Sequence, residues 1–273
     1  MPRSASGFLF VAIAATVAGH VRLTAAELQP RTVAAFDRYV SVTESRLTQE
    51  PLLWVDGLPD ARRAEAHDLM HRGQLSIDPV LMKDQGREIE VPDGLIHHWV
   101  GTAFIPGATV DQALMLLQDY DQHRRIYAPI VDRSRLIARN GDRFQLFLRF
   151  KMKKVLTVVV NSEHDAVFRR PGADRAEGWI RSTRIAEVDG AGEAGEREMP
   201  VGRDGGYLWR LNTYWRLLAR DAGLYVQCES VSLTRGIPWG FGWAVRPFVT
   251  SIPRESLTFT LETTRKELTG GVR

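Results

Sequence analysis

Apolar residues recur with a helical period in the first third of the chain and with a strand period after residue 94. Over residues 31–49 they return every three or four positions, which predicts an amphipathic helix. A second helix is expected over residues 60–72, with Gly73 placed to end it. Proline and glycine interrupt the segments around both helices. We therefore expect residues 27–93 to form a helical extension that packs on a larger domain.

The chain beyond residue 94 is predicted to be mostly strand. The segment 95–105 has the pattern of a strand, and the periodicity of 109–120 predicts a helix. Further strands are expected over 131–138, 143–151, 155–168, 177–188, 207–218 and 224–235. An Asn-Gly-Asp sequence before 143–151 is typical of a hairpin turn. Residues 189–206 are rich in glycine and glutamate and are expected to form a long exposed loop.

The order of these elements predicts the fold class. The end of the chain is expected to form helices over 241–250 and 253–268. One strand, one helix, a run of strands joined by short turns and a long terminal helix make an α+β order rather than repeated βαβ units. Short hairpins make the sheet antiparallel, with one apolar face that needs a cover. We expect a helix-grip fold, in which a curved antiparallel sheet wraps around the long C-terminal helix and leaves space between them.

Three segments carry a resemblance to a known family. They are GLIHHWVGTAFIPG at 94–107, DYDQHRRIYAPIV at 119–131 and SLTRGIPWGFGWAVRPFVTSIPRESLTFTLETTRKEL at 232–268. These segments resemble the START-like superfamily, also called SRPBCC, and its uncharacterised bacterial members in particular. The resemblance implies a START-like helix-grip domain over 94–273. Because the superfamily includes lipid-transfer proteins, polyketide cyclases and quinone-binding proteins, the resemblance does not select one function.

Residues 1–26 have the pattern of a secretory signal. One arginine precedes an uncharged apolar run over 8–19, and three small residues at 24–26 provide a cleavage site. The run is too short to cross about 30 Å of hydrocarbon as a helix. We therefore expect an exported protein, periplasmic or secreted. The alternative is an uncleaved membrane anchor that extends to Leu23.

Charge and cysteine content exclude several classes of function. The chain has 36 Lys+Arg against 33 Asp+Glu, and this near balance gives no electrostatic reason to expect a nucleic-acid partner. Cys228 is the single cysteine, so an intramolecular disulfide or a thiolate metal cluster cannot form. His67 and His71 have a spacing that can hold a metal ion, but the HExxH pattern is absent and surface histidines are the favoured interpretation. No metal or cofactor is expected.

No catalytic residue is assigned from the sequence. Asp119, Asp121 and Glu229 are candidates for acid–base work in a cyclase-like pocket if they are buried, although such residues more often cap a helix or face water. Whether the chain is an enzyme is left open, and a binding protein is favoured.

Aromatic residues are concentrated where the sheet and the terminal helix are expected to meet. On the face of strand 224–235 that is expected to face the terminal helix, the side chains become progressively smaller along the strand. Both features predict room for an apolar ligand beside the terminal helix. A few polar residues, among them Arg149, Thr213, Tyr214 and Ser230, are candidates to orient it. The full set of predicted ligand-binding residues is Trp99, Tyr127, Phe144, Leu146, Leu148, Arg149, Trp179, Trp209, Thr213, Tyr214, Trp215, Ser230, Trp239, Trp243 and Phe248.

Three functions are compatible with these patterns. The first is a protein that binds, and carries outside the cytoplasm, a hydrophobic small molecule or lipid, with transient membrane contact. The second is a cyclase or aromatase that acts on a polyketide-like substrate in the same cavity. The third is an interaction module whose core is filled by its own side chains. The first is favoured because a lipid needs a shield in an aqueous compartment.

Overall fold

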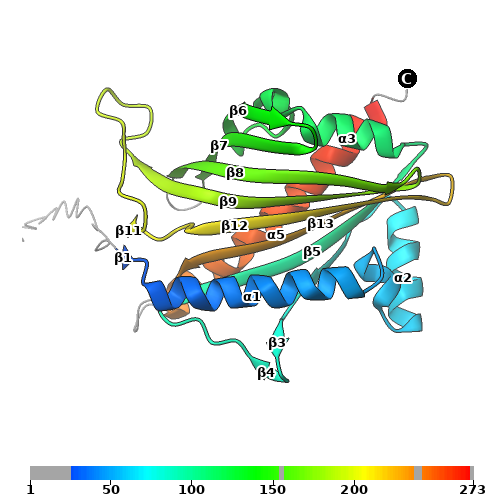
Figure 1. Cartoon of the computed structure of the whole chain (residues 1–273), viewed down its shortest axis with the longest axis horizontal. Coiled ribbons are helices and arrows are strands. Elements are labelled where there is room, and N and C mark those ends of the chain that lie inside the picture. Colours follow the sequence, from blue (N-terminus) through cyan, green and yellow to red (C-terminus); the bar gives the residue numbers. More distant parts are fainter. Residues whose placement is uncertain (1–25, 154–156, 237–241, 271–273) are drawn as a thin grey trace, which may run out of the picture.

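The computed structural model describes residues 26–153, 157–236 and 242–270, with side chains described for all of these except 242–250. Its centre is a nine-stranded sheet in which every pairing is antiparallel (Figure 1). In spatial order the main strands are β2 (Ser76–Pro79), β5 (Gly94–Pro106), β13 (Gly223–Arg235), β12 (Arg210–Arg220), β9 (Arg175–Asp189), β8 (Thr157–Gly172), β7 (Arg143–Lys153) and β6 (Val131–Asn140). The short β10 (Arg197–Glu198) pairs with β9.

Helices cover both faces of this sheet. The long helix α5 (Gly242–Gly270) crosses one face, which we call the α5 face, and α1 (Pro30–Gln49) lies along the other, which we call the α1 face (Figure 1). The remaining elements are α2 (Asp60–His71), α3 (Val110–Gln118), α4 (His123–Ile126), the 3₁₀ turns η1 (Trp54–Gly57) and η2 (Tyr120–Gln122), and the two-residue pairs β1 (Ala26–Glu27) with β11 (Arg203–Asp204) and β3 (Lys83–Asp84) with β4 (Arg87–Glu88). The expected helix-grip α+β fold is confirmed. No helix within the described ranges has the length and apolar character needed to cross a membrane.

Two glycines allow close packing on the α5 face. A Cβ atom at Gly101 would lie 2.5 Å from Leu261 Cδ1, so the bare backbone of β5 lets α5 approach the sheet. A Cβ atom at Gly178 would lie 2.5 Å from the ring of Phe168, which lies across β9. Both contacts belong to a core that includes Trp215, buried on the same face. These residues close one half of the grip with the protein's own side chains.

Gly178→Ala is expected to lower the free energy of unfolding by about 1–3 kcal/mol, because the added methyl group must displace the buried Phe168 ring. Gly195→Ala is the matched control, since nothing lies within 4 Å of a Cβ atom there. Urea unfolding of both variants measures the difference. Equal stability of the two variants would show that the ring moves freely and that this half of the grip is not tightly packed.

The α1 face is covered by the helical extension through polar contacts as well as apolar ones. Arg46 of α1 forms an ion pair with Glu229 of β13, and the side chain of Glu229 is fully buried. The backbone N–H of Trp54 donates to Gln227 Oε1 at 2.6 Å. The guanidinium of Arg216 donates to backbone carbonyls at the end of α1 and in the segment after it. Because β2 also pairs with β5, the segment before residue 94 contributes a strand to the sheet.

Three details differ from the expectations. The chain forms one helix over 242–270 where two were expected, so Pro253 lies inside a helix. Proline removes one helical hydrogen bond, and burial of Leu257 and Leu261 against the sheet offsets that loss. The short edge strand β2, which ends in a proline, was not expected. The loop 189–206 also contains β10 and β11, each of two residues.

Candidate functional site

The α5 face has a packed half and a second, polar half. Trp215, Phe168 and Phe144 close the packed half and are 6%, 3% and 2% exposed. The next two cross-strand rows end in the packed core on β7 and β8, the first at Ala166 and Phe144 and the second at Leu146. We call polar half their remaining residues together with Ser162 on β8. The first row contributes Trp99, Ser230, Thr213 and Ile180, and the second contributes His97, Ser232, Leu211, Ser182 and His164. Trp99, Ile180, Thr213 and Ser230 are half-buried although they lie in the middle of the sheet on the side that α5 crosses.

Two histidines are buried in the polar half. His164 on β8 is 3% exposed, and its Nε2 atom lies 2.9 Å from Ser162 Oγ. The ring of Phe150 meets it edge-on, with 6.5 Å between ring centroids. Burial lowers the pKa of His164 to about 4, so its ring is neutral near pH 7. His97 on β5 lies 3.1 Å from Thr234 Oγ1 through its Nε2 atom, and burial lowers its pKa to about 4 as well.

A buried carboxylate lies farther along the same face of β9. Glu187, two positions beyond the buried Ile185, accepts hydrogen bonds from the backbone N–H groups of Gly205 and Tyr207 at 2.9 and 2.8 Å. Burial raises the pKa of Glu187, and the nearby carboxylate of Asp204 raises it further, against the opposing effect of these hydrogen bonds. These two hydrogen bonds hold the turn before β12 against β9. The role that the contacts give Glu187 is therefore structural.

Eight of the predicted ligand-binding residues lie on the α5 side of the sheet. Trp99, Thr213, Ser230 and Leu148 are half-buried there. Phe144, Leu146 and Trp215 belong to the packed core and are buried. Tyr127 follows α4, and its hydroxyl lies 3.0 Å from Thr264 Oγ1 of α5. Trp239 lies outside the described residues, and the side chains of Trp243 and Phe248 lie outside the described side chains.

Four other predicted residues do not face α5. Arg149 alternates with Leu148 and Phe150 and is therefore on the α1 face, where it pairs with Glu196 at 2.8 Å. Trp179 and Tyr214 are opposite each other on that face, their rings 5.4 Å apart at 85°. Trp209 precedes β12 rather than lying in it, and its Nε1 donates to Asp204 Oδ1 at 3.0 Å. A strand was expected from residue 207, but β12 begins at Arg210, so Trp209 does not follow the alternation of that strand.

The candidate acid–base residues are placed away from the polar half. Glu229 lies on the α1 face, where His98 Nε2 donates to it at 2.6 Å. Burial opposes the charge of Glu229, but the His98 hydrogen bond and the Arg46 charge outweigh it and hold its pKa below the usual value. Asp119 and Asp121 are exposed, and Asp121 accepts the backbone N–H of Leu136. None of these carboxylates faces the polar half.

The two histidines of α2 also lie on the α1 side. His67 Nδ1 and His71 Nε2 lie 3.3 and 3.1 Å from the hydroxyl of Tyr225, which donates to Asp221 Oδ2 at 2.8 Å. His71 is exposed, as expected, and His67 is half-buried, and both rings are hydrogen-bonded to Tyr225 in the β12–β13 hairpin. Within the described residues, no group of three or more His, Cys, Asp or Glu side chains is arranged to hold a metal ion.

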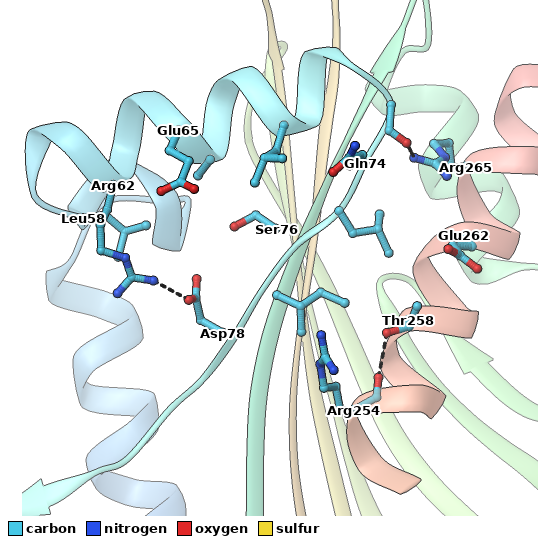
Figure 2. A pocket seen from close by; sticks show the side chains of 15 residues that line it. Leu58, Arg62, Glu65, Gln74, Ser76, Asp78, Arg254, Thr258, Glu262 and Arg265 are labelled. Carbon is cyan, nitrogen blue, oxygen red and sulfur yellow. Dashed lines mark hydrogen bonds and ion pairs between the residues drawn. The ribbon is translucent and has the colours of Figure 1, made fainter. Parts of the chain in front are cut away.

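Two surface pockets flank the grip. One of about 510 Å³ lies along the free edge strand β2, between α2 and α5 (Figure 2). The wall of this pocket contains both acidic and basic residues. Arg62 is paired with Asp78 at 2.6 Å, and α5 contributes Glu262 and Arg254 (Figure 2). The other, of about 350 Å³, lies between α3, the β6–β7 turn at Asp142 and the end of β8. Neither pocket is lined by residues of the polar half.

Besides His97, Leu211 and Ser232, the predicted site residues missed the four polar-half residues on β8 and β9, which are Ser162, His164, Ile180 and Ser182. The alternation of strands 155–168 and 177–188 carried the signal that could have found them, since it puts His164 on the same face as Ser162. That signal does not show which face is turned to α5, because Val159 and Val160 are both buried. The pairing of β8 with β9, which has an irregularity after Glu163, places His164 and Ser182 on the face that is turned to α5.

No protein-family model matches this sequence, and no curated protein matches it. Among solved structures, the chain is similar to the STAR-related lipid transfer protein from Xanthomonas axonopodis, with 16% identity and a TM-score of 0.46 over 70% of this chain and 98% of that one. A protein from Thermus thermophilus has 14% identity and a TM-score of 0.45, over 66% of this chain and 99% of that one. The Zhui aromatase/cyclase from a Streptomyces species has 12% identity and a TM-score of 0.45, over 66% and 97%. Similarity at this level concerns the fold alone, so what the chain binds has to be inferred from its own residues.

Proposed function

We propose that this protein binds one apolar small molecule or lipid between the polar half of the α5 face and α5, and that it does so outside the cytoplasm. The observation that carries the proposal is the division of the α5 face. One half is closed by buried rings, whereas the other combines half-buried Trp99 and Ile180 with small hydroxyl residues. The exported location rests on the signal pattern of residues 1–26.

The apolar part of such a ligand is expected to lie on Trp99 and Ile180, at the edge of the packed core. Removing about 300–400 Å² of ligand surface from water at roughly 25 cal/mol per Å² is worth on the order of 8–10 kcal/mol before the costs of association. Thr213 and Ser230 lie opposite each other in the same row, and their hydroxyls can orient a polar group. Desolvation therefore supplies the affinity, and the hydroxyl residues set the orientation.

Filling this space should abolish binding without unfolding the protein. Thr213→Trp places an indole in the middle of the polar half, whereas Gln145→Trp places the same ring on the exposed opposite face of β7. In a titration with Nile red, an uncharged fluorescent probe, we expect Thr213→Trp to weaken binding at least tenfold and Gln145→Trp to leave it unchanged. Urea unfolding of both variants shows whether the fold is kept.

Ser230→Phe is a second occluding variant, for use if Thr213→Trp does not fold. A wild-type protein that does not bind the probe would contradict the proposal. So would tight binding that survives both occluding variants in folded proteins, because the probe would then lie elsewhere.

A further inference from the structure

The hydrogen bonds around Ser162 fix which nitrogen of His164 carries the proton. A serine hydroxyl has one hydrogen, and that of Ser162 is donated to the carbonyl oxygen of Leu148 at 3.0 Å. The contact of 2.9 Å between Ser162 Oγ and His164 Nε2 must then be a hydrogen bond that the imidazole donates. The opposite assignment would leave two acceptor oxygens 3.0 Å apart with no hydrogen between them. His164 is therefore the tautomer protonated on Nε2.

The other nitrogen of this ring is a buried acceptor without a partner. A neutral imidazole protonated on Nε2 presents a lone pair on Nδ1. His164 Nδ1 is buried and accepts no hydrogen bond in the described structure. The ring lies on the side of the sheet that α5 crosses, with Leu146 opposite on β7 and Ser182 opposite on β9. An unsatisfied buried acceptor is costly, so a group found at this position in a native complex is expected to donate to it.

We infer that the ligand of the polar half is an uncharged amphipathic molecule with a hydroxyl group, and that His164 Nδ1 accepts the hydrogen bond of that hydroxyl. The inference rests on the proposed function and adds the chemical class of the ligand. An ionised carboxylate or a phosphodiester would bring only acceptor oxygens against the Nδ1 lone pair. None of the polar-half residues is a lysine or arginine that could neutralise it. His164 is thus a residue that determines specificity.

Three ligands of equal chain length separate the effects of the donor and of the charge. In displacement of Nile red at pH 7.5, we expect 1-dodecanol to compete at a concentration at least tenfold lower than dodecanoate. Dodecyl methyl ether, which is uncharged but lacks a donor, should be weaker than the alcohol by a factor of three or more. The preference for the alcohol over the ether isolates the hydrogen bond.

The variant His164→Phe removes the acceptor and keeps an aromatic ring of similar shape. We expect it to bring the alcohol and the ether within a factor of two of each other. His123→Phe is the matched control, because His123 is also buried but its Nε2 atom lies 3.4 Å from the carbonyl oxygen of Leu116 in α3, away from the polar half. Ser162→Ala, which frees the tautomer, is the second variant and should reduce the preference for the alcohol over the carboxylate.

The outcomes distinguish this inference from the proposed function. Nile red binding with equal displacement by the alcohol and the ether, or with stronger displacement by dodecanoate, overturns the inference and leaves the proposed function standing. The inference is also overturned if His164→Phe keeps the preference for the alcohol over the ether and Ser162→Ala keeps the preference for the alcohol over the carboxylate. Absence of probe binding by the wild-type protein contradicts both.

Discussion

Replacing Arg46 with methionine is expected to lower the free energy of unfolding by about 3–5 kcal/mol, the largest loss that we expect from a single change on the α1 face. Arg46 is the cation that pairs with Glu229, whose side chain is completely buried. Methionine keeps an unbranched apolar stem but removes the guanidinium, whose carbon also lies 5.2 Å from the centroid of the Trp54 ring, and it leaves a buried carboxylate without its charge partner. His98 donates to Glu229 but is neutral, because burial lowers the pKa of its imidazole. Urea unfolding at pH 7 measures the loss.

Two further variants make this result specific. In the double variant Arg46→Met with Glu229→Gln, the unpaired charge is gone, so part of the stability should return. Arg31→Met is the control, because Arg31 pairs with Asp93 at 2.5 Å on the surface, with both side chains more than half exposed. It should cost less than about 1 kcal/mol. If Arg46→Met costs no more than Arg31→Met, the helical extension is not held by this ion pair.

Truncating Leu261 to alanine is expected to cost about 2–5 kcal/mol, because it leaves a cavity between α5 and the sheet. Leu261 is fully buried in the core of the packed half, and its Cδ1 atom occupies the space that a side chain at residue 101 would need. Leu81→Ala is the control, since Leu81 is 57% exposed. Thermal or urea unfolding of the two variants gives the comparison.

The glycine opposite Leu261 provides a second check on this contact. Gly101→Ala alone is expected to destabilise the protein, because its Cβ atom would lie 2.5 Å from Leu261 Cδ1. Combined with Leu261→Ala, the same methyl group should fill part of the cavity and recover stability. Strictly additive losses in the double variant would mean that residues 101 and 261 are not in contact.

Periodicity was sufficient to predict the main elements of the fold. Apolar residues at helical spacing located α1 within one residue, and the alternation of Phe144, Leu146 and Leu148 located β7 and its buried face. The segments that periodicity missed are β2 and the two-residue strands, which are too short to show a period. The break that was expected before Pro253 does not occur, because burial of the helix that contains this proline outweighs the loss of one hydrogen bond.

The candidate site was predicted less completely, for a reason that two residues illustrate. Sequence alternation correctly separates Thr213 from Tyr214, but it does not show that α1 would bury the second face of the sheet as thoroughly as α5 covers the first. Tyr214 is 1% exposed because it belongs to the buried cluster that includes Phe36 and Val40 of α1, and its hydroxyl donates to Glu44 of the same helix. With both faces buried, aromatic character no longer distinguishes a ligand-binding residue from one under the helical extension. The unpartnered nitrogen of His164 depends on a cross-strand hydrogen bond and has no signature in the sequence.

Native mass spectrometry of the protein purified gently from its own host tests the binding proposal most directly. The proposal predicts a bound adduct of one uncharged, hydroxyl-bearing apolar molecule per chain, which is absent in Thr213→Trp and retained in Gln145→Trp. The mature chain should also begin near residue 27. A wild-type protein that is recovered without any adduct, or an adduct that persists in the folded Thr213→Trp variant, would contradict the proposal that the polar half of the grip is a ligand site.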